Sequence, residues 1–162
     1  MKGPAIRDGV ITEADTCREF VTPLLVEAGW GAAPHAIGEQ RSFTNGRIIV
    51  AGGKVRRGKQ RRADYLLYYR RDFPLAVVEA KEIGLPAETG VQQAREYAEI
   101  LGLKFAYATN GHRIIEIDYT TGTEREVDRF ATPAELWQRL IAATALPDPA
   151  TPHLLEPFNL AS

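Results

Sequence analysis

Residues 63–81 of the chain read ADYLLYYRRDFPLAVVEAK, and this stretch decides the fold. Residues 63–70 are rich in aromatic and apolar side chains, whereas residues 74–81 form a short apolar run that ends in two charges. Both patterns are typical of β-strands. Because only residues 71–73 separate them, we expect the two strands to form a hairpin.

The sequence on either side of this hairpin predicts further helices and strands. Three helices are expected, over residues 13–28, 86–101 and 133–143. Thr12 and Thr132 can cap the first and the last of these helices. Gly102 can end the second helix, and Pro23 predicts a kink or an early end in the first. Short strands are expected over residues 46–52, 103–109 and 112–119.

The order of these elements is helix, strands, helix, strand, strand and helix. That order predicts an α/β fold with a mixed or antiparallel central sheet that helices flank. The hairpin argues against a purely parallel, doubly wound sheet, because such sheets join their strands through helices.

Length and composition exclude several classes of protein. The chain has 162 residues, 44% of them hydrophobic, which suits one domain with one sizeable core. Its single cysteine, Cys17, excludes an internal disulfide framework and a cysteine-rich zinc site. No apolar run approaches the roughly 18 residues of a membrane span, and no apolar signal segment begins the chain. We therefore expect a cytoplasmic protein without a membrane partner.

The net charge of −1 conceals a very uneven distribution of charge along the chain. Residues 54–71 carry eight Lys or Arg side chains and one acid, so this segment has a net charge of +7 and the rest of the chain −8. Such a basic segment can contact a phosphate backbone, although a solvated loop is the alternative. The candidate DNA-binding residues are Lys54, Arg56, Arg57, Lys59, Arg61 and Arg62.

Three residues of the hairpin carry the candidate chemistry. Strand periodicity puts Glu79 and Lys81 on one face, and hairpin pairing can bring Asp64 close to Glu79. Two converging carboxylates suit a hard divalent ion such as Mg²⁺. A neighbouring lysine can orient a metal-bound water or stabilise charge on a phosphate oxygen. The alternative is a solvent-facing strand end with an unrelated turn aspartate.

Two helices offer further candidates. Gln93 and Tyr97 are four residues apart on the second helix, so they share a side and can face DNA or the carboxylates. Glu13 lies on the apolar side of the first helix, where a carboxylate needs a partner or a site. A polar pair at a helix edge and a solvated first-turn acid are the respective alternatives.

Taken together, Asp64, Glu79-Ala80-Lys81 and Gln93-x-x-x-Tyr97 resemble the PD-(D/E)xK nuclease motif with its QxxxY extension. This combination is similar to the N-terminal nuclease domain of type I restriction enzyme R (HsdR) subunits, and the resemblance covers roughly residues 10–145. One departure is Ala63, which stands where the motif has proline.

The resemblance implies a restriction-endonuclease-like αβββαβ core with a mixed central sheet and Mg²⁺-dependent cleavage of double-stranded DNA, with Mn²⁺ as a possible substitute. Asp64 and Glu79 would be metal ligands, with the Ala80 carbonyl as a third. Lys81 would be the catalytic lysine. Gln93 and Tyr97 would support the DNA or the catalytic cluster, and Glu13 would match an acid of the first helix.

The resemblance also implies a larger assembly. Residues 1–145 would form the nuclease domain, and residues 146–162, rich in proline, would link it to an ATP-driven DNA translocase. The subunit would assemble with modification (M) and specificity (S) subunits and cut unmodified DNA away from the recognition site. The alternatives are a stand-alone repair or junction nuclease, and a DNA-binding or docking module without catalysis.

Overall fold

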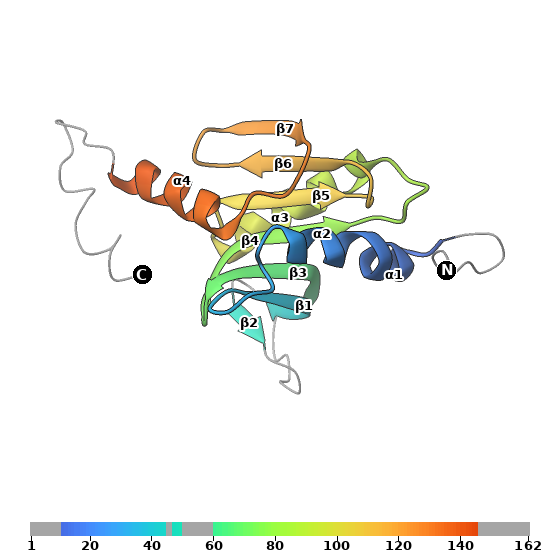
Figure 1. The fold of residues 1–162 in the computed structure, drawn as a ribbon, viewed down its shortest axis with the longest axis horizontal. Coiled ribbons are helices and arrows are strands. Elements are labelled where there is room, and N and C mark those ends of the chain that lie inside the picture. Colours follow the sequence, from blue (N-terminus) through green and yellow to red (C-terminus); the bar gives the residue numbers. More distant parts are fainter. Residues whose placement is uncertain (1–10, 45–46, 50–59, 146–162) are drawn as a thin grey trace.

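Seven strands form one sheet in the computed structural model, which describes residues 11–44, 47–49 and 60–145. The strand order is β2-β1-β3-β4-β5-β6-β7 (Figure 1). The strands are β1 (Ala36–Thr44), β2 (Arg47–Ile49), β3 (Arg61–Arg70), β4 (Phe73–Ala80), β5 (Phe105–Thr109), β6 (Ile114–Asp118) and β7 (Thr123–Val127). β4 and β5 run parallel, whereas the other neighbouring strands are antiparallel. The predicted hairpin, formed by β3 and β4, and the mixed sheet are confirmed.

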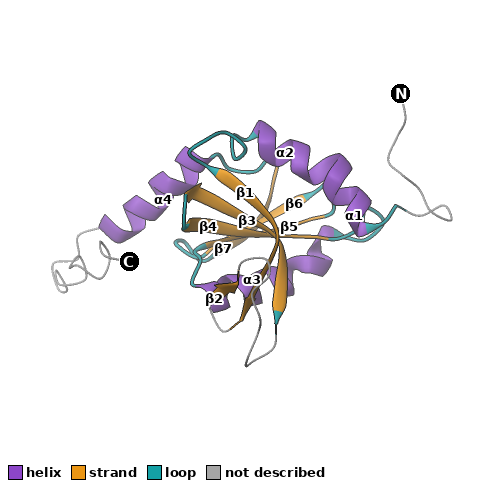
Figure 2. Ribbon diagram, turned by 90° about the horizontal axis from the view of Figure 1, so that it is seen from below, coloured by secondary structure: helices purple, strands orange, loops and turns teal. Residues whose placement is uncertain are grey.

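Helices cover both faces of this sheet. The helical segments are α1 (Glu13–Thr16), η1 (Cys17–Val21), α2 (Thr22–Glu27), η2 (Ala87–Gly90), α3 (Val91–Leu101) and α4 (Pro133–Ala145). α1, α2 and α4 lie on one face, and α3 lies on the other (Figure 2). η2 and α3 form the crossover from β4 to β5 that parallel strands require. The order of first helix, β1, β3, β4, α3 and β5 is the predicted restriction-endonuclease-like αβββαβ core.

The sheet separates two apolar cores. The core under α1, α2 and α4 is built from large side chains, including Leu25, Trp30, Tyr65, Phe105, Phe130 and Leu136. The core under α3 includes Phe43, Leu66, Val77, Ala94, Ala98 and Ile117. β4 contributes to both cores, since Val78 faces the first and Val77 the second. This two-sided burial explains why residues 74–78 read as a continuous apolar run.

The first helix contains a widened turn. η1 is a π-helical segment, in which the Thr22 N–H donates to the carbonyl of Cys17, five residues earlier. Pro23 follows directly. A proline inside a helix has no N–H to donate to the carbonyl four residues earlier, and its ring clashes with the same carbonyl. A widened turn relieves this conflict. The interruption predicted at Pro23 therefore takes the form of a π-helical turn, and the helix continues to Glu27.

The other predicted helices are present, with small differences at their ends. The helix predicted from Pro86 begins as the short turn η2 and becomes α-helical only at Val91. Gly102, with a φ of 72°, ends α3 as predicted. The Thr132 hydroxyl caps α4 by accepting from the Glu135 N–H at 3.1 Å.

The strands differ more from the prediction. The sequence does not predict β1 or β7. The strands predicted over residues 103–109 and 112–119 are shorter, as β5 and β6, and β4 ends at Ala80, one residue before Lys81. Of the strand predicted over residues 46–52, β2 is the described part. The predicted linker over residues 146–162 lies outside the described residues.

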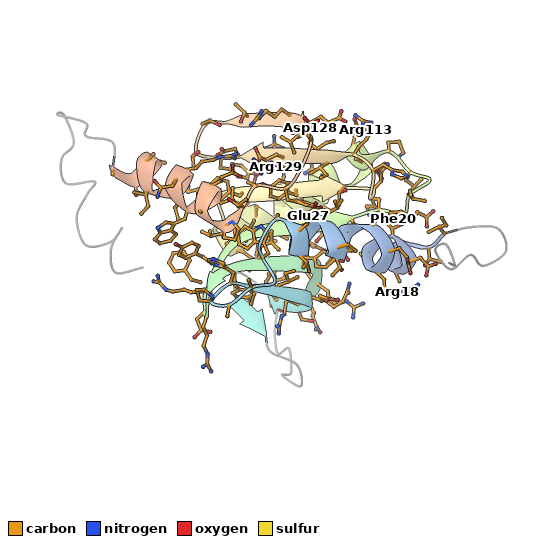
Figure 3. The ribbon with its side chains drawn as sticks, in the orientation of Figure 1. Arg18, Phe20, Glu27, Arg113, Asp128 and Arg129 are labelled. Atoms are coloured by element: carbon orange, nitrogen blue, oxygen red, sulfur yellow. The ribbon has the colours of Figure 1, made fainter. Side chains whose placement is uncertain are left out.

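β7 forms an edge of the sheet and carries charged side chains. Its five residues, TEREV, are largely exposed. Arg113 lies beside this edge (Figure 3) and forms ion pairs with Glu126 at 2.8 Å and with Glu88 at 2.9 Å. A charged outer strand resists pairing with a strand of another molecule. Within the described ranges, no helix is long and apolar enough to cross a membrane.

In β1 and β3, the side-chain pattern shifts from one face of the sheet to the other at the same point. In β3, Ala63 belongs to the core under α3, whereas Tyr65 belongs to the core on the opposite face. In β1, Phe43 belongs to the core under α3, whereas Ile37 packs against the opposite core. Residues an even number of positions apart lie on one face of a regular strand. Both strands therefore lose this alternation between these residues, where Gln40 stands opposite Asp64.

Candidate active site

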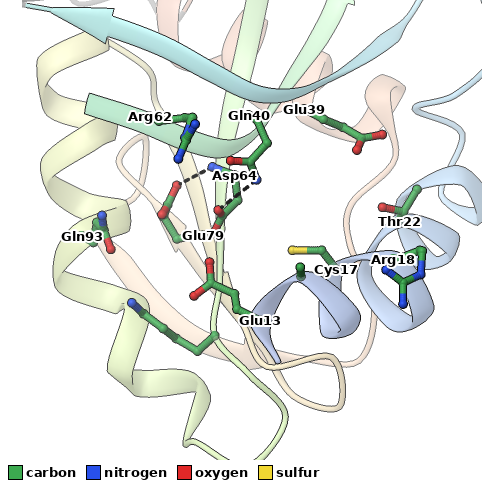
Figure 4. Close-up of a pocket in the computed structure, with 12 residues that line it drawn as sticks. Glu13, Cys17, Arg18, Thr22, Glu39, Gln40, Arg62, Asp64, Glu79 and Gln93 are labelled. Atoms are coloured by element: carbon green, nitrogen blue, oxygen red, sulfur yellow. Dashed lines mark hydrogen bonds between the residues drawn. The ribbon is translucent and has the colours of Figure 1, made fainter. Parts of the chain in front are cut away.

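At one end of the hairpin, hydrogen bonds to the carboxylates of Asp64 and Glu79 replace the backbone hydrogen bonds between β3 and β4. Tyr65 opposite Val78 is the last regular pair toward this end of the strands. Beyond it, the Asp64 N–H donates to Glu79 Oε2 at 3.1 Å, and the Ala80 N–H donates to Asp64 Oδ2 at 2.8 Å (Figure 4). Each carboxylate thus bridges to the backbone of the other strand. The predicted proximity of Asp64 and Glu79 is confirmed.

These acids line an open pocket of about 810 Å³. Glu13 of α1 also lines it, and the carboxyl groups of Glu13, Asp64 and Glu79 point toward one another in Figure 4. The pocket is also lined by Cys17 of η1, Gln40 of β1, Arg62 of β3, Gln93 of α3 and Lys81, which follows β4. Glu13, Asp64, Glu79, Lys81 and Gln93, predicted from the sequence as site residues, therefore meet in one place.

The carboxyl groups are unusually hard to ionise. Asp64 is 8% exposed and Glu79 only 3%. Burial, followed by the nearby charge of Asp64, raises the pKa of Glu79 to about 9. Burial also raises the pKa of Asp64, although the hydrogen bond from Ala80 opposes this rise. The pKa of Glu13 is raised by burial and by the charge of Asp64. Burial is thus the largest cause of the raised pKa at all three carboxyl groups, so each holds its proton more tightly than a solvent-exposed acid does.

Lys81 is held at the pocket by its backbone and by a glycine. Its N–H donates to the carbonyl of Thr109 on β5 at 2.8 Å, so the parallel strand fixes its position. A Cβ placed on Gly90 would lie 3.5 Å from Lys81 Cγ and 3.6 Å from Lys81 Cε. The lysine stem therefore runs along the bare face of Gly90 at the junction of η2 and α3.

Gln93 and Tyr97 share one side of α3, as predicted, but reach different surroundings. Gln93 Nε2 donates to the Tyr97 hydroxyl at 2.6 Å. Gln93 lines the carboxylate pocket, whereas Tyr97 packs edge-on against Phe43 with ring centroids 4.9 Å apart. Tyr97 thus holds Gln93 and lines only a neighbouring hollow.

This neighbouring hollow, of about 420 Å³, continues the pocket along α3. Arg62 and Gln93 line both. Arg61 lines the second hollow and forms an ion pair with Glu96 at 3.2 Å. Two of the predicted DNA-binding residues are therefore next to the carboxylates. The other four, Lys54, Arg56, Arg57 and Lys59, lie outside the described residues.

The donor set suits Mg²⁺. Among the described residues, no group of three or more His, Cys, Asp or Glu side chains has the arrangement of a metal cluster. Mg²⁺ needs no such group, because it commonly binds through one or two carboxylates and keeps several waters. Glu79 Oε2 and Asp64 Oδ2 accept the backbone hydrogen bonds, which leaves Glu79 Oε1 and lone pairs of Asp64 for a cation. A metal-binding role for the Ala80 carbonyl stays a prediction.

Gln40 lines this pocket, although the sequence does not predict it as a site residue. Its side-chain amide donates to Asp64 Oδ1 at 3.4 Å. Gln40 belongs to β1, a strand that the sequence does not predict, so no local signal connects it to Asp64. Cys17 also lines the pocket, where burial raises the pKa of its thiol to about 12. This thiol stays protonated near neutral pH, as expected for an inert cysteine.

Comparison with known proteins gives three matches. The family described as type I restriction enzyme R protein N terminus (HSDR_N) matches residues 39–130. The type I restriction enzyme EcoAI endonuclease subunit of Escherichia coli is 37% identical over 135 residues. That alignment covers 80% of this chain but 16% of the E. coli subunit. A solved fragment of a candidate HsdR subunit from Vibrio vulnificus YJ016 is 57% identical, with a TM-score of 0.75, and covers 91% of this chain and 29% of that one.

Proposed function

Because the chain belongs to the type I restriction enzyme R protein family, we propose that residues 1–145 are the Mg²⁺-dependent DNA endonuclease domain of such a subunit. One observation carries this proposal: two buried carboxylates, Asp64 and Glu79, converge on a pocket that also contains Lys81. Burying such acids is costly unless a cation balances them. The buried acids therefore support a catalytic role and argue against the alternative interpretation, in which this strand end only faces solvent.

In the proposed reaction, water hydrolyses a phosphodiester bond of double-stranded DNA. Asp64 and Glu79 would hold the ion, and the Ala80 carbonyl would be a third ligand. When bound, Mg²⁺ supplies a water of lowered pKa and neutralises charge on the phosphate. Mn²⁺ can replace Mg²⁺, because both accept carboxylate and water ligands.

Other residues of the pocket position the reactants. The Lys81 ammonium orients the attacking water and stabilises negative charge on the phosphate as the P–O bond breaks. Gln93, held by Tyr97 at 2.6 Å, presents its amide to the DNA backbone. Glu13 lines the pocket beside Asp64 and Glu79 and would accept a hydrogen bond from a water molecule bound there. Geometry of this kind places the water and the phosphate together before reaction.

The basic residues bind the DNA backbone. Arg61 and Arg62 line the hollow beside the carboxylates, which offers a path for phosphates next to the cleaved bond. Lys54, Arg56, Arg57 and Lys59, which lie outside the described residues, also contact DNA phosphates in our proposal. Contacts to phosphates position DNA without reading its sequence, so specificity comes from another subunit.

The proposal for the whole subunit goes further. The chain spans only 16% of the length of the E. coli relative, so most of such a subunit lies beyond it. Residues 146–162 link the nuclease domain to an ATP-driven translocase. The subunit assembles with M and S subunits in the cytoplasm and cuts unmodified DNA away from the recognition site. ATP is needed only by the longer protein.

A lysine variant tests this proposal in the full subunit, assembled with its partners. We expect Lys81→Ala to abolish linearisation of a plasmid with a recognition site while ATP hydrolysis continues, because the change removes one ammonium from the pocket. Lys104→Ala is the matched control, since Lys104 is exposed and does not line the pocket. Undiminished cutting by Lys81→Ala would contradict the assignment.

Two measurements separate the alternatives. A non-catalytic docking module would bind no Mn²⁺ between Asp64 and Glu79, whereas the nuclease would lose Mn²⁺ binding in Asp64→Asn. A stand-alone repair or junction nuclease would cut branched DNA without ATP or partner subunits. Cutting that requires ATP and the partners supports the restriction subunit.

A further inference from the structure

Gln40 has an unfavourable backbone conformation in the middle of a strand. Its φ is 53°, in the left-handed region. The neighbouring pairs, Glu39 with Tyr65 and Arg41 with Ala63, keep one register, so Gln40 stands directly opposite Asp64. Glycine adopts such a φ without strain, whereas a residue with a Cβ does not. A glutamine at this position therefore needs a reason.

Packing does not supply that reason, because the Gln40 side chain is exposed. It turns instead toward the carboxylate pocket, where Nε2 donates to Asp64 Oδ1 at 3.4 Å (Figure 4). Strained residues in proteins occur often at functional sites, where the conformation aims a side chain. Here the left-handed φ coincides with the point at which β1 and β3 change faces.

The second oxygen of Asp64 is held from the other side. Asp64 Oδ2 accepts the Ala80 N–H at 2.8 Å, so β4 fixes one oxygen and β1 fixes the other. Two hydrogen bonds from opposite strands define the plane of a carboxylate, which a single bond leaves free to rotate. The direction of the remaining lone pairs, and with it the position of a bound cation, depends on that plane.

We propose that Gln40 is a positioning residue, which holds the Asp64 carboxylate in the orientation that binds the divalent ion. This inference rests on the proposed function. Partners that orient a metal-binding carboxylate affect metal affinity although they do not touch the metal. The strained backbone of Gln40 is then a cost to folding that the site requires. A purely structural role would make glycine the better residue.

Two variants separate these roles. Gln40→Gly relieves the backbone strain and removes the amide, whereas Gln40→Met keeps the length of the side chain and removes only the donor. We expect Gln40→Gly to raise the melting temperature of the metal-free chain. We expect both variants to weaken Mn²⁺ binding by about tenfold, the lower end of the effect of such orienting partners.

The control is Asp72→Gly. Asp72 also has a left-handed φ, of 64°, but lies in the turn between β3 and β4 and does not line the pocket. It should gain thermal stability from the change and bind Mn²⁺ like the unchanged chain. Binding is measured by titration calorimetry and stability by thermal unfolding in EDTA, so neither readout depends on DNA cleavage.

The outcomes are distinguishable. Weaker Mn²⁺ binding by Gln40→Met and Gln40→Gly, with full binding by Asp72→Gly, supports the inference. Unchanged binding by Gln40→Met overturns it while leaving the proposed nuclease intact. If the unchanged chain itself binds no Mn²⁺, the proposed metal site fails, and the role of Gln40 fails with it.

Discussion

Glu79 has the most perturbed carboxyl group of the pocket. It is 3% exposed, and its pKa is raised to about 9 from the usual 4.5 by burial and by Asp64. A group that holds its proton more tightly when folded stabilises the fold below its unfolded pKa. That stabilisation is lost as the pH rises through the folded pKa. Without a cation, ionised Glu79 therefore works against folding.

This shift predicts the pH dependence of stability. In EDTA, the free energy of unfolding should fall between pH 5 and pH 9 more steeply for the unchanged chain than for Glu79→Gln, which cannot ionise. The two free energies are measured by urea unfolding across this range. Excess Mg²⁺ should reduce the difference in slope, because the cation favours the ionised carboxylate. Parallel curves in EDTA would contradict the predicted titration.

At the scale of single residues, the sequence predicted the acidic centre well. Asp64, Glu79 and Lys81 lie within one hairpin, so their spacing and strand periodicity were enough to bring them together. Gln40 could not be predicted in the same way, because its contact with Asp64 depends on a left-handed φ. No residue type requires that conformation, and glutamine is not enriched in it.

At the scale of secondary structure, the left-handed φ of Gln40 also explains why the sequence did not predict β1. The residues of β1, AIGEQRSFT, show no apolar alternation, because the strand changes faces near Gln40. β7 escaped for another reason, since the residues TEREV bury little apolar surface. Helix ends were easier, because Thr12, Gly102 and Thr132 act locally.

α4 provides a prediction at this scale. Thr132→Ala should lower the free energy of unfolding by about 1 kcal/mol, because it removes the hydroxyl that caps the Glu135 N–H at 3.1 Å. Thr144→Ala, near the other end of α4, should change it by less than about 0.5 kcal/mol, since Thr144 is exposed. Both values come from urea unfolding. Equal losses in the two variants would argue against capping.

Across the whole molecule, the distribution of charge bears on the DNA binding that we propose. The chain has a net charge of −1, yet Arg61 and Arg62 stand beside the carboxyl groups of Glu13, Asp64 and Glu79. A phosphate backbone can approach these acids only if cations and arginines offset the repulsion. We therefore expect DNA binding and divalent ions to support one another.

Salt dependence tests this arrangement. Arg62→Ala should lower the slope of log affinity against log salt by about one unit for a duplex of any sequence, because one phosphate contact is lost. Arg71→Ala is the matched control, since Arg71 is exposed in the turn between β3 and β4, away from the pocket. Fluorescence anisotropy at several salt concentrations gives both slopes. A smaller slope only in Arg71→Ala would place the DNA elsewhere.

The sequence predicted the β3–β4 hairpin, the mixed character of the sheet, its flanking helices and the family, because hydrophobic periodicity and the motif are properties of short segments. It could not predict that β3 and β4 separate at the acids. That separation depends on how β1, β3 and β4 pair, and strand pairing joins residues that lie far apart in the chain.

The hydrogen bonds of Asp64 and Glu79 to opposing backbone N–H groups also bear on how the proposed activity could be lost over evolutionary time. Truncation of either acid to alanine leaves a buried N–H without an acceptor and disturbs the sheet. An asparagine or a glutamine keeps an acceptor in the same place. Related domains that fold but do not cut DNA should therefore carry asparagine or glutamine at positions 64 and 79, which keeps these hydrogen bonds.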